Sequence, residues 1–261
     1  MSAKSDQYER DVAKYADKSV EGLTASRPKV PTSYSDVLLE FTAPATKGKR
    51  AVTVKTWMEV KMNHTDNLMN PRFSFINNRW VTDEAYKSPA TNIIEDYWNK
   101  NKEAKNWIKD LRAWLSKQKK FKGDPNKFTL YSTKTPRKSD PNAVSPELMK
   151  SFLTTRQTKN ICVIPSVDVG ELVKLHYLKG KSEPAPYLSA GNDFYRFSRS
   201  NPLKIPNVPE FRGTNRLVFR VGDRSDNYEL QAEVKLSSMP ASSYSVKPNS
   251  SKKNPFKFIG L

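Results

Sequence analysis

Two acidic residues and one lysine, Asp36, Glu59 and Lys61, have types and spacing suited to hydrolysis of a phosphodiester bond. Asp36 begins an apolar segment, and Glu59-Val60-Lys61 lies near the end of a second segment rich in β-branched residues. Residues two apart in a strand point to one face, so Glu59 and Lys61 should project together. Two carboxylates, with the Val60 carbonyl, can hold Mg²⁺, which lowers the pKa of a bound water. A lysine beside them can orient that water or stabilise charge in the transition state.

The spacing Glu-x-Lys is weak evidence alone, because it occurs three times in the chain. Glu103-Ala104-Lys105 lies in a helical pattern, where residues two apart do not share a face. Glu233-Val234-Lys235 lies in a predicted strand and is the real competitor. The acids upstream of Glu233, of which Glu229 is the nearest, are too close to it in the sequence to lie on the other strand of a hairpin. The copy at 59–61 is therefore favoured.

The segments around this motif predict the elements that position it. Apolar spacing predicts a helix over 8–23, ended by Gly22 and Pro28, and alternation predicts strands over 34–41 and 51–62. These strands are expected to form an antiparallel hairpin around a loop at 43–48, which would bring Asp36 to Glu59. A helical region follows over 90–120, then a short helix over 147–154, a buried strand over 160–165 and a helix over 167–178.

The composition of the chain changes after residue 184, where proline becomes frequent. The strands predicted in this part are short and span 194–197, 216–221 and 228–236. The expected fold class is α/β (α+β), with a central mixed sheet flanked by helices and a β-rich C-terminal extension. We expect a core domain over 1–180 with a basic helical insertion, an extension over 181–240 that contacts DNA, and a flexible basic tail over 241–261.

An acid at the start of one strand, Glu-x-Lys on the next, and the order helix–strand–strand–helix–strand together resemble the PD-(D/E)XK (restriction-endonuclease-like) nuclease superfamily. The resemblance implies a magnesium-dependent DNA endonuclease, with Mn²⁺ as a substitute ion, that leaves a 5′-phosphate. Asp36 and Glu59 would bind the metal and Lys61 would be the catalytic lysine. Many members add a glutamate from the first helix, and Glu9 is favoured over Glu21 for that part. Ser35 replaces the usual proline, and the stretch 59–68 is similar to phage-encoded members.

Charge supports a polyanionic partner, because 45 Lys and Arg against 27 Asp and Glu give a net charge of +18. Nine of these basic residues lie between Lys100 and Lys122. We expect double-stranded DNA as the partner and a homodimer as one way to cut both strands. The DNA-contacting candidates are Lys105, Lys109, Arg112, Lys119, Lys120, Arg72, Arg216 and Arg220.

The composition also excludes several kinds of site. The single cysteine, Cys162, excludes an intramolecular disulfide and a thiolate zinc cluster, and only two histidines, His64 and His176, are present. The N-terminus has no apolar signal region, and no apolar run is long enough to cross a bilayer, so no membrane partner and a cytoplasmic setting are expected.

Two other classes of function remain open on the sequence alone. A single-stranded DNA-binding protein would combine a basic groove with exposed aromatic residues, and this chain has both residue types. A basic structural protein of a virion would account for the charge. Neither alternative gives a reason for the arrangement of Asp36 and Glu59-x-Lys61.

Overall fold

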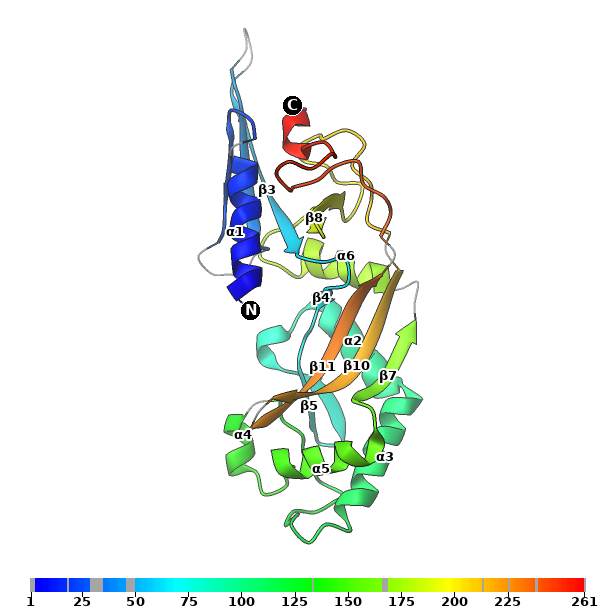
Figure 1. The fold of residues 1–261 in the computed structure, drawn as a ribbon. Coiled ribbons are helices and arrows are strands. Elements are labelled where there is room, and N and C mark those ends of the chain that lie inside the picture. Colours follow the sequence, from blue (N-terminus) through cyan, green and yellow to red (C-terminus); the bar gives the residue numbers. More distant parts are fainter. Residues whose placement is uncertain are drawn as a thin grey trace. The chain divides into compact units, whose positions relative to one another are not determined.

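The computed structural model describes residues 3–17, 19–28, 35–45, 50–132, 134–165, 169–212, 214–224, 226–237 and 239–260. The chain divides into two units that are each drawn from separate segments (Figure 1). Unit 1 comprises 1–66, 170–214 and 236–261, and unit 2 comprises 67–169 and 215–235. The units are therefore interleaved along the chain and differ from the three consecutive segments expected from composition.

Unit 1 is built on a five-stranded mixed sheet in the order β1-β2-β3-β8-β9. Its strands are β1 (Leu23–Ser26), β2 (Val37–Ala43), β3 (Val52–Lys61), β8 (Tyr187–Ala190) and β9 (Asp193–Arg196). β3 and β8 are parallel, whereas the other pairs are antiparallel. The expected mixed sheet flanked by helices is confirmed at the level of an α/β fold.

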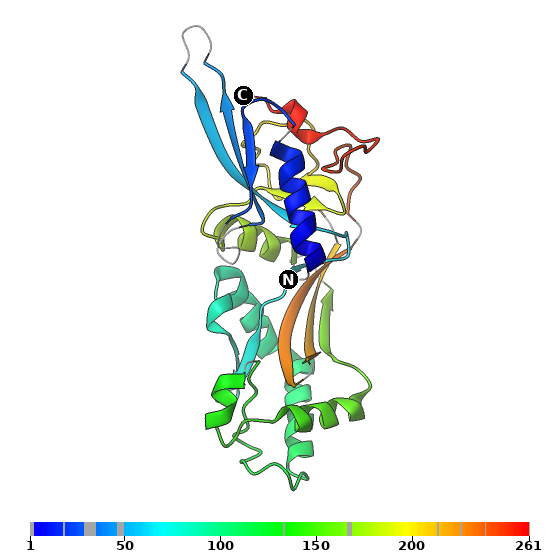
Figure 2. The same ribbon diagram turned by 60° about the vertical axis from the view of Figure 1, so that its left-hand side comes forward.

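Helices cover this sheet. α1 (Ala3–Asp17) packs along it, as Figure 2 shows, and α6 (Val169–Lys179) precedes β8 in the chain. The buried residues Val12, Ala13 and Ala16 follow the three- and four-residue spacing of one helix face. The helix ends five residues before Gly22, so the prediction of a helix to residue 23 was wrong.

The segment after α1 instead turns into the edge strand β1, which was not predicted from the sequence. Gly22 has φ +82°, and a Cβ there would lie 2.5 Å from the Thr42 carbonyl oxygen. Only glycine tolerates both the left-handed backbone and this close approach. The Gly22 oxygen also accepts a hydrogen bond from the Thr42 nitrogen, which fixes β1 beside β2.

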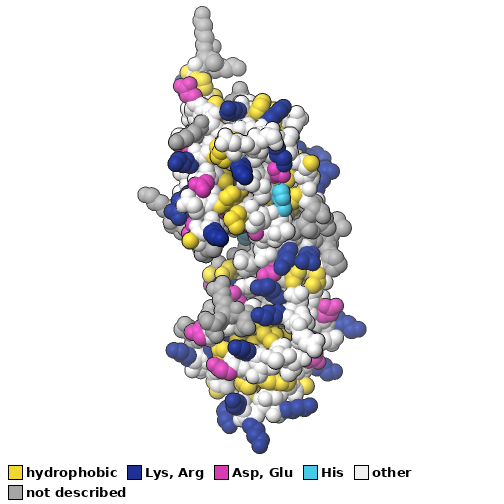
Figure 3. Space-filling model, in the orientation of Figure 1, with side chains coloured by type: hydrophobic (Ala, Val, Ile, Leu, Met, Phe, Trp, Pro, Cys, Tyr) yellow, Lys and Arg dark blue, Asp and Glu magenta, His cyan; other side chains and the backbone are white. Residues whose placement is uncertain are grey.

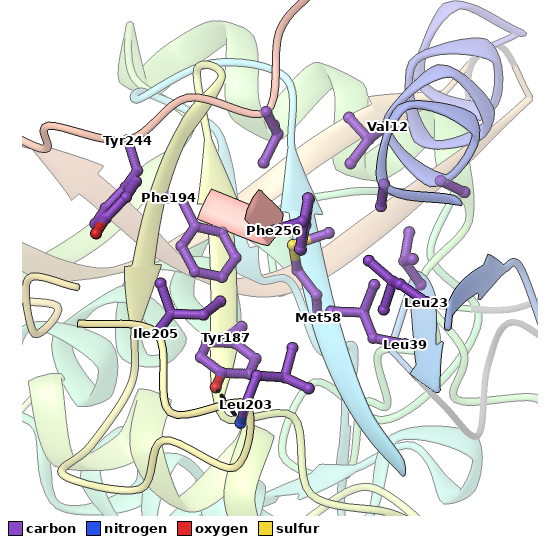
Figure 4. Packing of buried hydrophobic residues seen from close by; sticks show 14 of the residues in the cluster. Val12, Leu23, Leu39, Met58, Tyr187, Phe194, Leu203, Ile205, Tyr244 and Phe256 are labelled. Atoms are coloured by element: carbon purple, nitrogen blue, oxygen red, sulfur yellow. Dashed lines mark hydrogen bonds between the residues drawn. The ribbon is translucent and has the colours of Figure 1, made fainter. Parts of the chain in front are cut away.

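The core of unit 1 joins α1, the sheet and the C-terminal segment. Figure 4 shows Val12 of α1, Met58 of β3 and Phe194 of β9 in one cluster with Tyr244 and Phe256. Phe256 lies in the short 3-10 helix Pro255–Phe258 and is fully buried. The last twenty or so residues were expected to be flexible, but in the structure an aromatic side chain anchors them to the core.

Unit 2 contains a four-stranded sheet in the order β4-β11-β10-β7 and a two-stranded sheet. Its strands are β4 (Asn67–Met69), β5 (Phe73–Ile76), β6 (Arg79–Thr82), β7 (Asn160–Pro165), β10 (Thr214–Arg224) and β11 (Asn227–Ser237). Its helices are η1 (Glu84–Tyr86), α2 (Pro89–Lys100), α3 (Lys102–Leu115), α4 (Lys134–Ser139) and α5 (Pro146–Arg156). Trp98 lies at the centre of the core, with ring centroids 4.3 Å from those of Trp80 and Phe219.

Two predictions in this unit need correction. The helical region 90–120 is two helices, because Asn101 ends α2 and caps α3 through its side chain. The strand 160–165 exists as β7, but it pairs with β10 in unit 2. The strand that follows α6 beside β3 is β8.

Candidate active site

Asp36, Glu59 and Lys61 lie at one end of the β2–β3 hairpin. The hairpin is antiparallel, and its register pairs Val37 with Met58, which places Asp36 beside the end of β3. The Asp36 Oδ2 atom accepts a hydrogen bond of 2.8 Å from the Val60 backbone nitrogen. The loop expected at 43–48 lies partly outside the described residues. The hairpin predicted from the sequence therefore brings Asp36 to the Glu59–Lys61 segment.

Glu59 and Lys61 share a face of β3 and are in direct contact. The Lys61 Nζ atom lies 2.6 Å from Glu59 Oε1, and the Tyr177 hydroxyl of α6 donates to the same oxygen at 3.1 Å. Glu59 is 4% exposed, and its second oxygen, Oε2, is buried and has no hydrogen-bond partner among the described residues. Buried carboxylate oxygens normally have a partner, so this atom is a candidate ligand for a cation.

Electrostatics keep the Glu59–Lys61 pair ionised. Burial opposes ionisation of Glu59, but the charges of Lys61 and Lys181 outweigh it and lower the pKa of the carboxyl group. Burial likewise opposes the charge of Lys61, and the negative charges of Glu59 and Asp36 raise its pKa well above the usual value. The site therefore holds a carboxylate and an ammonium in contact.

Asp36 behaves differently from Glu59. Burial, the negative charge of Glu59 and, more weakly, that of Glu9 raise the pKa of Asp36 to about 7. Lys61 and the hydrogen bond from Val60 act in the opposite direction but do not prevail. A cation next to Asp36 and Glu59 would remove the repulsion between the two carboxylates.

Glu9 of α1 is the third acid of this group, and it is 3% exposed. Its Oε2 atom forms an ion pair with Arg27, and Ser5 donates to Oε1 at 3.3 Å. Glu9 is close enough to raise the pKa of Asp36, whereas Glu21 is exposed in the turn after α1. Of the two glutamates considered, the structure brings Glu9 to the group.

Three residues of α6 and the loop after it also belong to the group and were not predicted as site residues from the sequence: His176, Tyr177 and Lys181. Tyr177 is fully buried and stands 118 positions from Glu59 in the chain. Burial, followed by the nearby charge of Lys181, lowers the pKa of His176 to about 4, so this imidazole is neutral at pH 7. No local spacing signals these residues, because the contact depends on how α6 packs on the sheet.

The turn between β8 and β9 borders the group as well. The Gly191 nitrogen donates to the Lys61 carbonyl at 3.0 Å, and the His64 ring lies against Gly191. His64 Nε2 is 3.6 Å from Asp193 Oδ2, and Asp66 accepts from the Asn63 backbone at 2.9 Å. Asp66 is therefore a loop cap, and His64 lies near the site without a hydrogen bond to Glu59 or Lys61.

The donor set suits magnesium better than a transition metal. In the described part of the chain, no three His, Cys, Asp or Glu side chains are arranged to hold a metal ion. Mg²⁺ does not need such a set, since it is usually bound through one or two carboxylates and keeps several waters. Asp36 and Glu59 fit that pattern, since Oε2 of Glu59 accepts no hydrogen bond from the part of the chain that the structure describes.

The competing Glu-x-Lys copies have other surroundings. Glu233 of β11 forms ion pairs with Arg220 Nε at 2.9 Å and with Lys235 Nζ at 3.3 Å. Glu233 is 3% exposed and stands in a row of buried polar residues on β11 with Glu229 and Gln231. Arg72 forms an ion pair with Glu229 at 2.5 Å. In this network two acids are paired with three bases, so each carboxylate has a basic partner.

All eight DNA-contacting candidates belong to unit 2. Three of them are held by intramolecular contacts, namely Arg72, Arg112 and Arg220, and Arg112 donates to Asn78 and Pro125. The other five are exposed, namely Lys105, Lys109, Lys119, Lys120 and Arg216. Figure 3 shows Lys and Arg side chains distributed over the visible faces of both units, interspersed with other types.

Unit 1 is thus a mixed α/β unit in which the buried Glu59 lies with the half-buried Asp36 and Lys61 at the end of a β-hairpin. Comparisons with protein families, with curated proteins and with solved structures find no match to the chain. Within the described residues, no helix is both long enough and apolar enough to span a membrane. Cys162 is buried in β7, and burial raises the pKa of its thiol to about 12.

Proposed function

We propose that the protein is a magnesium-dependent nuclease that hydrolyses phosphodiester bonds in DNA, with its active site at Asp36, Glu59 and Lys61. One observation carries the proposal. Glu59 is a buried carboxylate with one oxygen paired to Lys61 and the other without a hydrogen-bond partner among the described residues, and Asp36 stands beside it with a raised pKa. In the Glu233 network, by contrast, each of the two acids has a basic partner.

Asp36 and Glu59 would hold the ion. Bound there, Mg²⁺ supplies positive charge to the scissile phosphate and lowers the pKa of a water for attack. Asp36 keeps its orientation through the Val60 nitrogen, and Glu59 keeps its own through Tyr177. Both carboxylates are therefore fixed in place before substrate binds, which lowers the entropic cost of assembling the site.

Lys61 is the residue that acts on the attacking water or on the transition state. Its ammonium is kept charged by Glu59, so it can stabilise the negative charge that develops on the phosphate oxygens. Lys181 adds a second cation close enough to lower the pKa of Glu59. Neutral His176 adds no third positive charge.

The order of elements in unit 1 also supports the proposal. Apart from the extra edge strand β1, the elements α1, β2, β3, α6 and β8 have the helix–strand–strand–helix–strand order on which the resemblance to PD-(D/E)XK nucleases rests, with α6 and β8 in place of the expected segments 90–120 and 160–165. Unit 2 enters mainly between β3 and α6. It supplies the exposed lysines proposed to contact DNA, and dimerisation is the proposed route to cutting both strands.

Cleavage of supercoiled plasmid tests the proposal. Wild type, Glu59→Gln and Lys61→Ala would each be incubated with Mg²⁺ and with EDTA, and DNA binding would be measured in parallel. We expect nicking or linearisation by wild type with Mg²⁺ only, and binding without cleavage by both variants. Glu233→Gln and Lys235→Ala are matched controls from the second buried Glu-x-Lys copy and should still cut. A wild-type chain that binds DNA but cuts no form with any divalent ion would leave the binding-protein alternative.

A further inference from the structure

The two faces of the sheet in unit 1 carry different residues near the end of β3. Met58 and Val60 belong to the core that packs against α1. Glu59 and Lys61 alternate with them along the strand and therefore project to the opposite face, where the Tyr177 hydroxyl of α6 donates to Glu59. A substrate bound at Glu59 and Lys61 would therefore lie on the α6 side of the sheet.

The loop that follows α6 on this side is fixed to the helix at both ends. The Gly180 nitrogen donates to the His176 carbonyl at 3.0 Å, and the Ala185 nitrogen donates to the Tyr177 carbonyl at 2.9 Å. A Cβ at position 180 would lie 2.8 Å from the His176 carbonyl oxygen, so glycine allows the chain to fold closely over the end of the helix. The loop thereby holds Lys181 over the helical turn that carries Tyr177.

Lys181 places a positive charge next to the candidate active site. Its Nζ atom lies 5.9 Å from the centre of the Tyr177 ring, and the hydroxyl of that ring is bonded to Glu59. Burial opposes ionisation of Glu59, and the charge of Lys181 is second only to that of Lys61 in lowering the pKa of this carboxyl group. Lys181 is half-buried and forms no ion pair with another residue in the described part of the chain. Its ammonium is therefore available to an anionic substrate.

We propose that Lys181 binds a backbone phosphate of the DNA strand, next to the phosphate that is cut. The inference rests on the proposed nuclease function and adds a substrate-binding residue to it. Lys61 is in contact with Glu59 at 2.6 Å, whereas Lys181 acts on Glu59 through its charge and, within the described residues, without a hydrogen bond to it. Lys61 is thus placed at the phosphate bound to the ion, and Lys181 is placed at the neighbouring negative charge of the same strand.

Disulfide crosslinking tests this contact. Cys162 is the only cysteine of the chain, it is buried, and burial raises the pKa of its thiol to about 12, so Lys181→Cys would carry one reactive thiol. The probe is a short DNA duplex that bears an activated disulfide tether on one backbone phosphate at a time, incubated with the variant in EDTA. Lys181→Cys should crosslink in higher yield than Lys179→Cys, at an exposed lysine two residues earlier.

The crosslinked complex also reports where the contact lies. After purification and addition of Mg²⁺, the DNA should be cut at the phosphate next to the tethered one. Cleavage at a distant phosphate, or a yield no greater than that of Lys179→Cys, would overturn the inference.

Alanine and arginine variants separate a phosphate contact from a structural role. Lys181→Ala should weaken duplex binding in EDTA about 3- to 10-fold, and the slope of log K against log salt concentration should become shallower by about 0.9, as for the loss of one phosphate contact. Lys181→Arg should retain both, and Lys179→Ala should change both less. A lower melting temperature of Lys181→Ala with an unchanged salt slope would mean that the lysine only stabilises Glu59, and would overturn the inference.

These outcomes are distinguishable from failure of the nuclease proposal, because crosslinking and binding in EDTA do not depend on cleavage. If wild type cuts DNA but the Lys181 variants crosslink and bind like the Lys179 variants, this inference alone fails. If Lys181→Cys crosslinks preferentially but wild type cuts no DNA with any divalent ion, the nuclease proposal fails. The assignment of the contact to a phosphate beside the cut then fails with it.

Discussion

The Nζ atom of Lys61 lies 2.6 Å from Oε1 of Glu59, although both side chains are largely removed from water. Their separation by one residue in β3 makes the contact local, but its burial depends on α6, which contributes Tyr177. Replacing only one residue of a buried ion pair lowers stability strongly, because the remaining buried charge loses its partner.

Lys61→Met should therefore lower the free energy of unfolding by about 3 kcal/mol, because it leaves Glu59 charged and buried. The double variant Glu59→Gln/Lys61→Met should recover part of that loss, since it removes both charges. Urea denaturation of the single and double variants measures this coupling. Additive effects would mean that the two side chains are not coupled.

Because the pKa of Asp36 is raised, we expect the stability of the metal-free protein to depend on pH. Its pKa is about 7 in the folded state against a usual 3.8, so the folded state binds more protons between these values. Stability should therefore fall as pH rises from about 4 to about 7. Melting temperatures in EDTA should show this decline in wild type, and Asp36→Asn should lack that component.

The pair of Asp36 and Glu59 also leads us to expect that Mg²⁺ stabilises the protein. Above pH 7 the ionised Asp36 and Glu59 repel each other, so Mg²⁺ should raise the melting temperature of wild type. Asp36→Asn should show little increase, and Glu233→Gln, in the other buried acidic network, should respond like wild type. If Mg²⁺ raised the melting temperature of all three proteins equally, the ion would bind at a site other than Asp36 and Glu59.

Tyr177→Phe should remove the hydroxyl that fixes Glu59 and lower cleavage by about tenfold, as losses of residues that orient metal ligands commonly do. It should also cost about 1 kcal/mol of stability through the lost hydrogen bond. Tyr187→Phe is the control, because Tyr187 is equally buried and bonded to Asn201 and Leu203. Both variants should lose stability in thermal melts, but only Tyr177→Phe should lose activity.

Gly191→Ala should destabilise unit 1 by about 1 kcal/mol or more, because φ is +56° there and a Cβ would lie 2.9 Å from the His64 ring. It should also reduce cleavage, since the Gly191 nitrogen is bonded to the Lys61 carbonyl. Gly222→Ala is the comparison, as the nearest atoms to its Cβ are at 3.6 Å and beyond. Denaturation and plasmid cleavage of both variants measure the difference.

The sequence by itself determined the hairpin and the grouping of Asp36 with Glu59 and Lys61. Alternation of apolar residues defines strands locally, and side chains two apart must share a face. It also indicated the α/β class and the first helix, although the helix ends at Asp17 and β1 was not predicted. The left-handed backbone of Gly22 accounts for β1, because it lets the chain turn into a strand beside β2.

Only the tertiary structure decided which distant segments complete the site. Strand 160–165 and β8 are both short apolar runs, and pairing alone assigns the first to unit 2 and the second to a place beside β3. Packing within unit 1 brings Tyr177 and Lys181 to Glu59, and packing within unit 2 encloses Glu233 with Arg220. The burial of a side chain, and the charges of distant residues that act on it, depend on which elements pack together. The spacing of residues along one strand does not specify that packing.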